Sequence, residues 1–313
     1  MAQNIGLELA GFLLLACVVG YCAVFYAQQQ RLPGGFEVTS TVNNTMPLVL
    51  AGMAQTLVVL TRGIDLSVGG IIDLTNAVAA ITLGGSAGSM VAWSVIVLLI
   101  GAACGLLNGL LVGLGRLQPI LVTLATLSIY QGLAIRVLPQ PGGQVPEAFT
   151  SVLANSSAPW SLLYIVALAA GWAMFRRIRL GVAIYAIGND PQAAQASGIA
   201  AQKTIIVAYV LAGVLSAAGG LFLAASATAG DATTGNGFTL TSIVAVVLGG
   251  VSLFGGRGSA AGAIMGAFVI NMIVNILFFA HIDPLYQDFY EGLFLVVAVM
   301  AANAIGLLVR VRR

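Results

Sequence analysis

The stretch from Leu74 to Gly115 contains no charged side chain. A run of this length accommodates two apolar helices of about 20 residues, each long enough to cross the hydrocarbon core of a bilayer. The glycine-rich turn from Gly84 to Gly88 separates the two halves. A transmembrane barrel requires short segments of alternating polarity, which this stretch lacks. Hydrophobic residues are 59% of the whole chain and charged residues 7%. We therefore predict an all-α integral membrane protein.

Apolar runs between charges and Gly or Pro clusters predict about ten transmembrane helices in a single domain, 1–313. The predicted spans are 7–27, 46–61, 68–84, 90–115, 118–136, 160–175, 203–224, 239–254, 258–280 and 288–309. If both termini are cytoplasmic, ten of the twelve Lys and Arg residues lie on the inner side, and only Arg31 and Arg136 lie outside. The positive-inside rule favours this orientation. The outer loops would then be 28–45, 137–159, 225–238 and 281–287.

A polar segment from Arg176 to Lys203 interrupts the apolar spans. Its sequence predicts a short helix, with Asp190 as N-cap, Pro191 at the first helical position and Gly198 after the end. The small side chains of Ala193, Ala194 and Ala196 would give this helix a low-relief face suited to docking in a groove of another subunit. The alternative is a solvated cytoplasmic loop, because positive loops are usual on the inner side.

Several kinds of chemistry are absent from the sequence. A phosphate-binding loop of the GxxxxGK[ST] type needs a Gly-Lys pair, but the only lysine, Lys203, follows Gln202. A single histidine, His281, excludes the HExxH type of zinc site. Residues 84–88 match GxSxG, yet the strand-to-helix context of that motif is missing, so we interpret them as a turn. The three cysteines lie in apolar spans, and we predict neither a disulfide nor a metal site.

Glycines recur every four residues in two of the predicted spans. Such ridges allow neighbouring helices to approach closely, which favours helix association in lipid. We predict close helix contacts along both ridges, formed by Gly101, Gly105, Gly109 and Gly113 in one span and by Gly258, Gly262 and Gly266 in the other.

Polar residues inside apolar spans are candidates for a solute path, because each is costly in lipid unless it faces a cavity or a partner helix. Amides, hydroxyls, a carboxylate and an aromatic ring would suit the hydroxyl groups of a sugar. The alternative is interhelical hydrogen bonding, and for Asp73 an ion pair with Arg62 or Arg116. The candidates are Asp73, Asn76, Thr123, Thr126, Tyr130, Asn271 and Asn275.

Four motifs occur in a fixed order along the chain. They are GIDLSVG at 63–69, QPILVTL at 118–124, YAIGN at 185–189 followed by SGI at 197–199, and VVLGGVSL at 246–253 followed by GGRG at 255–258. Together they resemble the ribose-type permeases of bacterial ABC importers, collinearly from about Asn43 to the C-terminus. The first motif contributes Gly63, Asp65, Ser67 and Gly69. We interpret Asp65 and Ser67 mainly as residues that start the following helix, with gating as the alternative.

The resemblance implies a multi-pass permease of the type II importer fold in the bacterial inner membrane. It implies a second permease subunit, in a homodimer or a heterodimer, a cytoplasmic ABC ATPase and a periplasmic sugar-binding protein, besides membrane lipid; no nucleic acid partner is expected. ATP would be bound by the ATPase, so the chain itself needs no cofactor and is not an enzyme. The segment 176–203 would carry the coupling helix, with Arg176, Arg177, Arg179, Gly188, Asn189, Asp190, Pro191, Ala193, Ala194 and Gly198 as coupling residues.

The chain departs from the family pattern in two places. Residues 238–241 read FTLT where the family usually has an acidic run, and Asp73 and Asn76 stand in place of small residues. The resemblance thus implies import of a monosaccharide, which could be a pentose, a furanose hexose or a related polyol. Two alternatives remain: a secondary transporter driven by an ion gradient, with Asp73 as the coupling carboxylate, and a membrane scaffold without transport.

Overall fold

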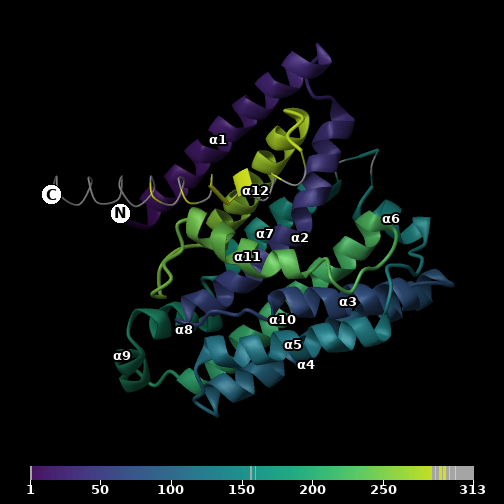
Figure 1. Ribbon diagram of the computed structural model, residues 1–313. Helices are drawn as coiled ribbons and strands as arrows, with labels where there is room; N and C mark the ends of the chain where they lie inside the picture. Colours follow the sequence, from purple (N-terminus) through teal and green to yellow (C-terminus); the bar gives the residue numbers. More distant parts are fainter. Residues whose placement is uncertain are drawn as a thin grey trace, which may run out of the picture.

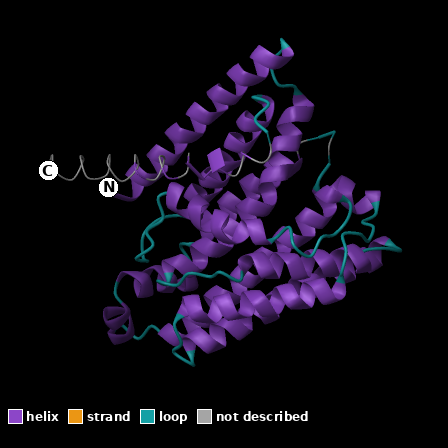
Figure 2. Cartoon of the chain, in the orientation of Figure 1, coloured by secondary structure: helices purple, strands orange, loops and turns teal. Residues whose placement is uncertain are grey.

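The described part of the chain is helical. The computed structural model describes residues 2–155, 157–158 and 160–283, together with residues 286, 289, 290, 292, 293, 296 and 300. Within these residues there is no β-strand, and the one pairing of extended backbone is an isolated bridge between Gly142 and Gly230 (Figure 2). The prediction of an all-α membrane protein is confirmed.

Twelve helices with defined bounds follow one another in the described part of the chain (Figure 1). They are α1 (Ala2–Gln29), α2 (Gly35–Leu60), α3 (Val68–Thr82), α4 (Ala87–Gly113), α5 (Pro119–Val137), α6 (Glu147–Leu153), α7 (Trp160–Phe175), α8 (Arg179–Asn189), α9 (Pro191–Ala196), α10 (Ala201–Ala227), α11 (Asn236–Leu248) and α12 (Ala260–Phe279). In Figure 1, α8 and α9 lie at one end of the molecule and α6 lies at the other.

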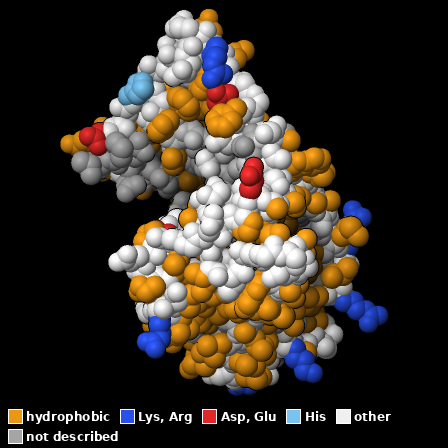
Figure 3. All heavy atoms as spheres, turned by 90° about the vertical axis from the view of Figure 1, so that its right-hand side faces the viewer, with side chains coloured by type: hydrophobic (Ala, Val, Ile, Leu, Met, Phe, Trp, Pro, Cys, Tyr) orange, Lys and Arg blue, Asp and Glu red, His pale blue; other side chains and the backbone are white. Residues whose placement is uncertain are grey.

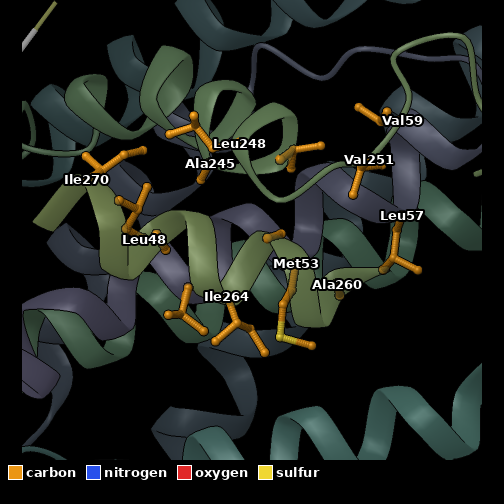
Figure 4. Close-up of a cluster of buried hydrophobic side chains, with 14 of the residues drawn as sticks. Leu48, Met53, Leu57, Val59, Ala245, Leu248, Val251, Ala260, Ile264 and Ile270 are labelled. Carbon is orange, nitrogen blue, oxygen red and sulfur yellow. The ribbon is translucent and has the colours of Figure 1, made fainter. Parts of the chain in front are cut away.

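Helix α2 is the most enclosed of the long described helices. Of its most apolar 18-residue window, 94% is buried, whereas the corresponding windows of α1 and α5 are 22% and 28% buried. It packs against α10, α11 and α12. Figure 4 shows the core between three of these helices, where Leu48 and Met53 of α2 lie beside Ala245 of α11 and Ile264 of α12. The outer helices expose apolar side chains, which cover much of the surface in Figure 3, as expected for a lipid-facing surface.

The predicted close contact along the first glycine ridge is confirmed. Helix α4 lies so close to α10 that a Cβ atom on Gly105 would be 2.2 Å from the Tyr209 carbonyl oxygen, and one on Gly101 would be 2.4 Å from the Gly213 carbonyl oxygen. The second ridge is shorter than predicted. Gly262 and Gly266 pack against α11 and the residue that follows it, but Gly258 precedes α12 in a loop with φ +117°.

The predicted count of ten spans is not confirmed. Six described helices are long and apolar enough to cross a membrane, or seven if α7 and α8, bent by 74° relative to each other, form one span. Helices α3 and α11 are apolar but only 15 and 13 residues long. The predicted span 288–309 lies almost wholly outside the described residues. Two predicted loops were also wrong: residues 35–45 are the first turns of α2, and 179–189 form α8.

Candidate functional site

The short helix α9 has the ends that its sequence predicted. The Asp190 carboxylate accepts hydrogen bonds from the N–H groups of Gln192 at 2.9 Å and Ala193 at 3.0 Å, and Pro191 occupies the first helical position. Gly198 follows the helix in the left-handed conformation, with φ +81°. These bonds satisfy backbone donors that a free helix end would leave open. Helix α9 is therefore well defined despite having 6 residues.

The face of α9 differs from the predicted one. Ala193 and Ala196 are exposed, but Ala194 is 5% exposed and faces the chain's own interior. The prediction that Ala194 belongs to a docking surface is therefore wrong. The reason is helical spacing: Pro191 and Ala194 are three residues apart and share the face that turns inward, and Gln192, Ala193 and Ala196 lie around the exposed part.

Helix α8 connects the end of α7 to α9, and the sequence did not indicate it. Its buried residues are Gly181, Ile184, Ile187 and Gly188, at the spacing of one helical face. The basic residues Arg176, Arg177 and Arg179 are exposed at the bend between α7 and α8. In the described part of the chain none of the three has an ion pair, so their charges are free for lipid headgroups or a partner.

Arg62, which follows α2, binds the end of α8. Its Nε donates a hydrogen bond to the Gly188 carbonyl at 2.8 Å, and its Nη2 donates one to the Asn189 carbonyl at 2.8 Å. Cations are favourable at helix C-termini, where carbonyl groups lack intrahelical partners. Arg62 itself has φ +69°, a backbone conformation that costs a residue with a Cβ atom about 1–2 kcal/mol. The last residue of α8 is thus held from a distant part of the chain.

A third segment, the loop before α12, joins this contact. The Gly256 N–H donates to the Leu60 carbonyl at 3.1 Å, and the Asn189 side-chain amide donates to the Gly256 carbonyl at 3.1 Å. The Tyr185 hydroxyl donates to the Gly258 carbonyl at 2.7 Å. A Cβ atom on Gly188 would lie 1.9 Å from the Leu60 oxygen, so only glycine fits there. Motifs far apart in the sequence therefore meet at one point.

A buried polar network starts one turn further along the chain. The Asp65 carboxylate accepts hydrogen bonds from the Ser67 N–H at 2.8 Å and the Ser67 hydroxyl at 2.6 Å, and the Ser67 oxygen accepts one from the Asn108 side chain at 2.8 Å. Asp65, Ser67 and Asn108 are all at most 1% exposed. Ser67 stands at the N-cap position of α3, but its side chain caps no backbone donor of that helix. The network instead ties the start of α3 to α4.

Two further elements bind the same turn. The Thr123 hydroxyl of α5 accepts a hydrogen bond from the Leu66 N–H at 3.0 Å. The Gln55 amide of α2, oriented to match its neighbours, donates to the Asp65 carbonyl at 2.9 Å and accepts from the Asp65 N–H at 3.2 Å. All four sequence motifs therefore lie on one connected group of contacts. Sequence reasoning missed Arg62, Asn108 and Gln55; a polar residue in an apolar span was the available signal for the last two.

The predicted path residues of α3 do not line a cavity. The Asp73 Oδ1 accepts a hydrogen bond from the Gly235 N–H at 2.6 Å, and the Asn76 Oδ1 accepts one from the Asp231 N–H at 2.8 Å. Both side chains are at most 1% exposed. Asp73 does not pair with Arg62, whose guanidinium binds the end of α8. Asp73 and Asn76 thus hold the 228–235 connection at the start of α11. In that connection, hydrogen bonds from Thr233 lower the pKa of Asp231.

The stripe on α5 also serves helix packing. Tyr130 donates a hydrogen bond to the Cys104 carbonyl of α4 at 2.9 Å, and the Thr126 hydroxyl donates to the Thr123 carbonyl at 3.3 Å. Thr123, Thr126 and Tyr130 are all at most 3% exposed. For these five residues on α3 and α5, the alternative of internal hydrogen bonding is the observed arrangement.

Asn271 and Asn275 of α12 are the path candidates that stay partly exposed. The Asn275 amide donates to the Asn271 side chain at 3.1 Å and to the Thr41 hydroxyl of α2 at 3.3 Å. A separate cavity of 530 Å³ between α2, α7 and α10 is apolar, with Met53, Tyr164 and Trp172 in its wall. None of the predicted path residues lines it, so it offers no polar site for a sugar.

Replacing Asp73 by Ala is expected to lower stability rather than only transport. The change leaves the buried Gly235 N–H without an acceptor, which costs about 1–3 kcal/mol. Thermal unfolding of the purified protein should show a lower midpoint for Asp73→Ala and a smaller shift for Asp73→Asn, which keeps an acceptor oxygen. If Asp73→Ala lost transport without losing stability, Asp73 would instead belong to the solute path.

Residues 38–299 match the family model described as "Branched-chain amino acid transport system / permease component". The chain belongs to this permease family. The match begins in the first turn of α2 and includes all the contacts of Arg62, Asp65 and Asp190 described above. The family confirms the sequence-based resemblance to permeases of bacterial importers and leaves the solute open.

The permease is similar to curated proteins over most of its length. It is 34% identical to the ribose import permease protein RbsC of Escherichia coli K12, over 87% of this chain and 88% of the relative. It is 33% identical to the autoinducer 2 import system permease protein LsrC of Photorhabdus laumondii, over 94% of this chain and 88% of the relative. No solved structure matches the permease at a significant level.

Proposed function

We propose that this chain is the transmembrane subunit of an ATP-driven ABC importer for a monosaccharide, either a pentose, a furanose hexose or a related polyol. Membership of the permease family and the similarity to ribose and autoinducer 2 import permeases support the proposal. ATP is hydrolysed by a separate ATPase subunit, so the permease is not an enzyme and binds no cofactor of its own.

The observation that carries the proposal is the capped helix α9 together with its attachment. A helix of 6 residues is capped at its start by Asp190 and followed by Gly198, and it presents small and polar side chains on its exposed face. Such a helix suits a groove on the ATPase. The exposed basic residues at the α7–α8 bend support a position at the inner membrane surface.

Transport then requires that movement of the ATPase is transmitted to the transmembrane helices. Closure of the ATPase on ATP displaces α9 and, through Asp190, the end of α8. The permease alternates between inward-open and outward-open states that ATP binding populates differently. A periplasmic sugar-binding protein delivers the solute to the opposite face, where α6 lies. Because the polar residues of α3 and α5 are buried inside one chain, the solute path lies between this chain and a second permease subunit.

The test is purification of the tagged permease from its bacterial host in mild detergent, followed by reconstitution with the proteins that co-purify. We expect an ABC ATPase in the complex and uptake of radiolabelled D-ribose, or of another sugar of a pentose and polyol panel, that needs ATP and the binding protein. Uptake driven by a proton or sodium gradient alone would establish a secondary transporter instead.

The same complex tests the docking face of α9. Ala193→Arg places a large charged side chain on the exposed face and is expected to remove the ATPase from the purified complex while the permease still inserts. Gln202→Arg adds the same charge to an exposed position of α10 and is the control. Full ATPase binding and full transport by Ala193→Arg would exclude α9 as the coupling helix.

The orientation of the permease is a separate prediction. In a background without the native cysteines, a cysteine at Ser157, exposed before α7, should react with an impermeant thiol reagent added outside intact spheroplasts. A cysteine at Gln192, exposed on α9, should react only after permeabilisation, because the positive-inside rule places it in the cytoplasm. The reverse pattern of labelling would invert the topology.

A further inference from the structure

Helices α2 and α11 of the permease end in the same way, with a turn that also follows α9 and α12. α2 ends with Val58, Val59 and Leu60, and α11 ends with the same residue types at 246–248. After α2, the N–H groups of Arg62 and Gly63 donate to carbonyls three and five residues earlier, at 2.9 and 3.1 Å. After α11, the N–H groups at 250 and 251 do the same, at 2.9 and 3.1 Å. The two turns are therefore counterparts in their backbone hydrogen bonds and in the three residues that precede them.

The counterparts differ in the residue at the left-handed position. Gly250 has φ +74°, and glycine adopts this conformation without steric cost. Arg62 occupies the equivalent position with φ +69°. A close contact between Gly250 and α1 also favours glycine in the second turn, since a Cβ atom there would lie 2.6 Å from the Gly6 Cα. The backbone conformation of the first turn would be better served by glycine. The presence of arginine at position 62 is therefore explained by the contacts of its side chain.

The Arg62 side chain links the turn after α2 to the end of α8. Its hydrogen bonds to Gly188 and Asn189 reach 126 and 127 residues along the chain. Asn189 is followed directly by Asp190, which ends α8 and caps α9. On the other side, Arg62 lies three residues before Asp65, whose network joins the start of α3 to α4. No other charged side chain in the described part of the chain makes hydrogen bonds to the end of α8.

We propose that Arg62 is the positioning residue that transmits displacement of the coupling helix α9 to the turn at 61–67 and hence to the start of α3. The inference rests on the proposed function for the origin of the displacement, but the link itself is internal to this chain. Two bonds from one planar guanidinium fix both the distance and the direction between the end of α8 and the turn. When α9 moves, the turn moves with it.

The link is tested in the purified full-length permease in lipid nanodiscs, without any partner. Cys17, Cys22 and Cys104 are replaced, and the half-buried Leu66 in the turn is changed to cysteine as a probe for maleimide labelling. Ala194→Arg then displaces α9, because Ala194 is buried. We expect this displacement to change the labelling rate by at least about fivefold, the lower end of usual coupling between sites. In the Arg62→Gly background the displacement should change the rate less, because only the link from Asn189 through Gly256 to Leu60 remains.

Arg116→Gly is the matched control. Arg116 is also exposed after a helix, also has positive φ, at 53°, and has no hydrogen bond from its side chain to a described residue. Both variants lose one charge and relieve one strained backbone position, so a general effect on charge or stability would appear in both. In the Arg116→Gly background, Ala194→Arg should still change the labelling rate of the cysteine at position 66. An equal effect in the presence and absence of Arg62, or no effect with Arg62 present, overturns the proposal.

A second arm separates this inference from the proposed function. The co-purified ATPase with ATP and vanadate replaces Ala194→Arg as the cause of the displacement. The Leu66 probe should respond more strongly with Arg62 present than with Arg62→Gly. A positive first arm without any co-purifying ATPase would leave the internal link in place and remove the proposed function. If an ATPase co-purifies but the Leu66 probe responds equally with Arg62 and with Arg62→Gly, the proposed function stands and the internal link is excluded.

Discussion

Gly105→Ala is expected to leave almost no folded permease. The added methyl group would lie 2.2 Å from the carbonyl oxygen of Tyr209, a backbone atom of α10 that cannot rotate away. Helices α4 and α10 must then separate along their length. We expect a loss of about 3 kcal/mol or more, at the upper end of the range for overpacked interiors. The measurement is the yield of monodisperse protein after detergent extraction, with the thermal midpoint of whatever remains.

Gly132→Ala is the matched control, because the same methyl group on α5 has no atom within 4 Å. Alanine is favoured over glycine inside a helix by about 1 kcal/mol, so this variant should be as stable as the parent or slightly more stable. A similar yield of Gly105→Ala and Gly132→Ala would show that α4 and α10 are not in close contact at Gly105.

Gly188→Ala is expected to abolish coupling while leaving the spans in place. A Cβ atom at this position would lie 1.9 Å from the Leu60 carbonyl oxygen and 2.3 Å from the Gly256 nitrogen. The end of α8 must move away, and its bonds to Arg62 are lost. Overpacking of about 1–3 kcal/mol corresponds to a fall of about 5- to 150-fold in a coupled rate, and we expect ATP-driven uptake to fall by at least tenfold on this scale.

The control for this change is Gly237→Ala, on an exposed helix position with no atom within 4 Å of the added methyl group. Membrane insertion and protein yield should be similar for the two variants, and uptake should be normal only in Gly237→Ala. Normal uptake by Gly188→Ala would show that the contact between α8 and the end of α2 can open without consequence for transport.

Features encoded by neighbouring residues were predictable from the sequence. The caps of α9 depend on Asp190, Pro191 and Gly198, all within one short segment, and the structure places each as predicted. The glycine ridge of α4 was predictable for the same reason, since its spacing of four residues defines a face before any partner is known. The all-α membrane fold follows from composition and from the length of the apolar runs.

Features that depend on distant residues were not predictable. Asp73 looks like a path residue or half of an ion pair, and only the position of Gly235 shows that it holds a backbone N–H. Ala194 looks like its neighbours Ala193 and Ala196, and only the packing of α9 turns it inward. Nothing near Arg62 in the sequence indicates a bond to residue 188. In each case the deciding contact is with a part of the chain that is distant in sequence or is set by the packing of the whole helix.

The enclosure of α2 has a consequence for biosynthesis. Helix α2 is the least hydrophobic of the six long spans, with a mean hydropathy of 1.2, and it is the most buried. Its main neighbour α10 starts only at Ala201. At elongation rates of about 5–20 residues per second, roughly 7–30 seconds pass between synthesis of α2 and synthesis of α10. During that interval α2, which contains polar residues such as Asn43 and Thr56, lacks its packing against α10. The nascent helix must therefore be sheltered by the insertion machinery until the second half of the chain arrives.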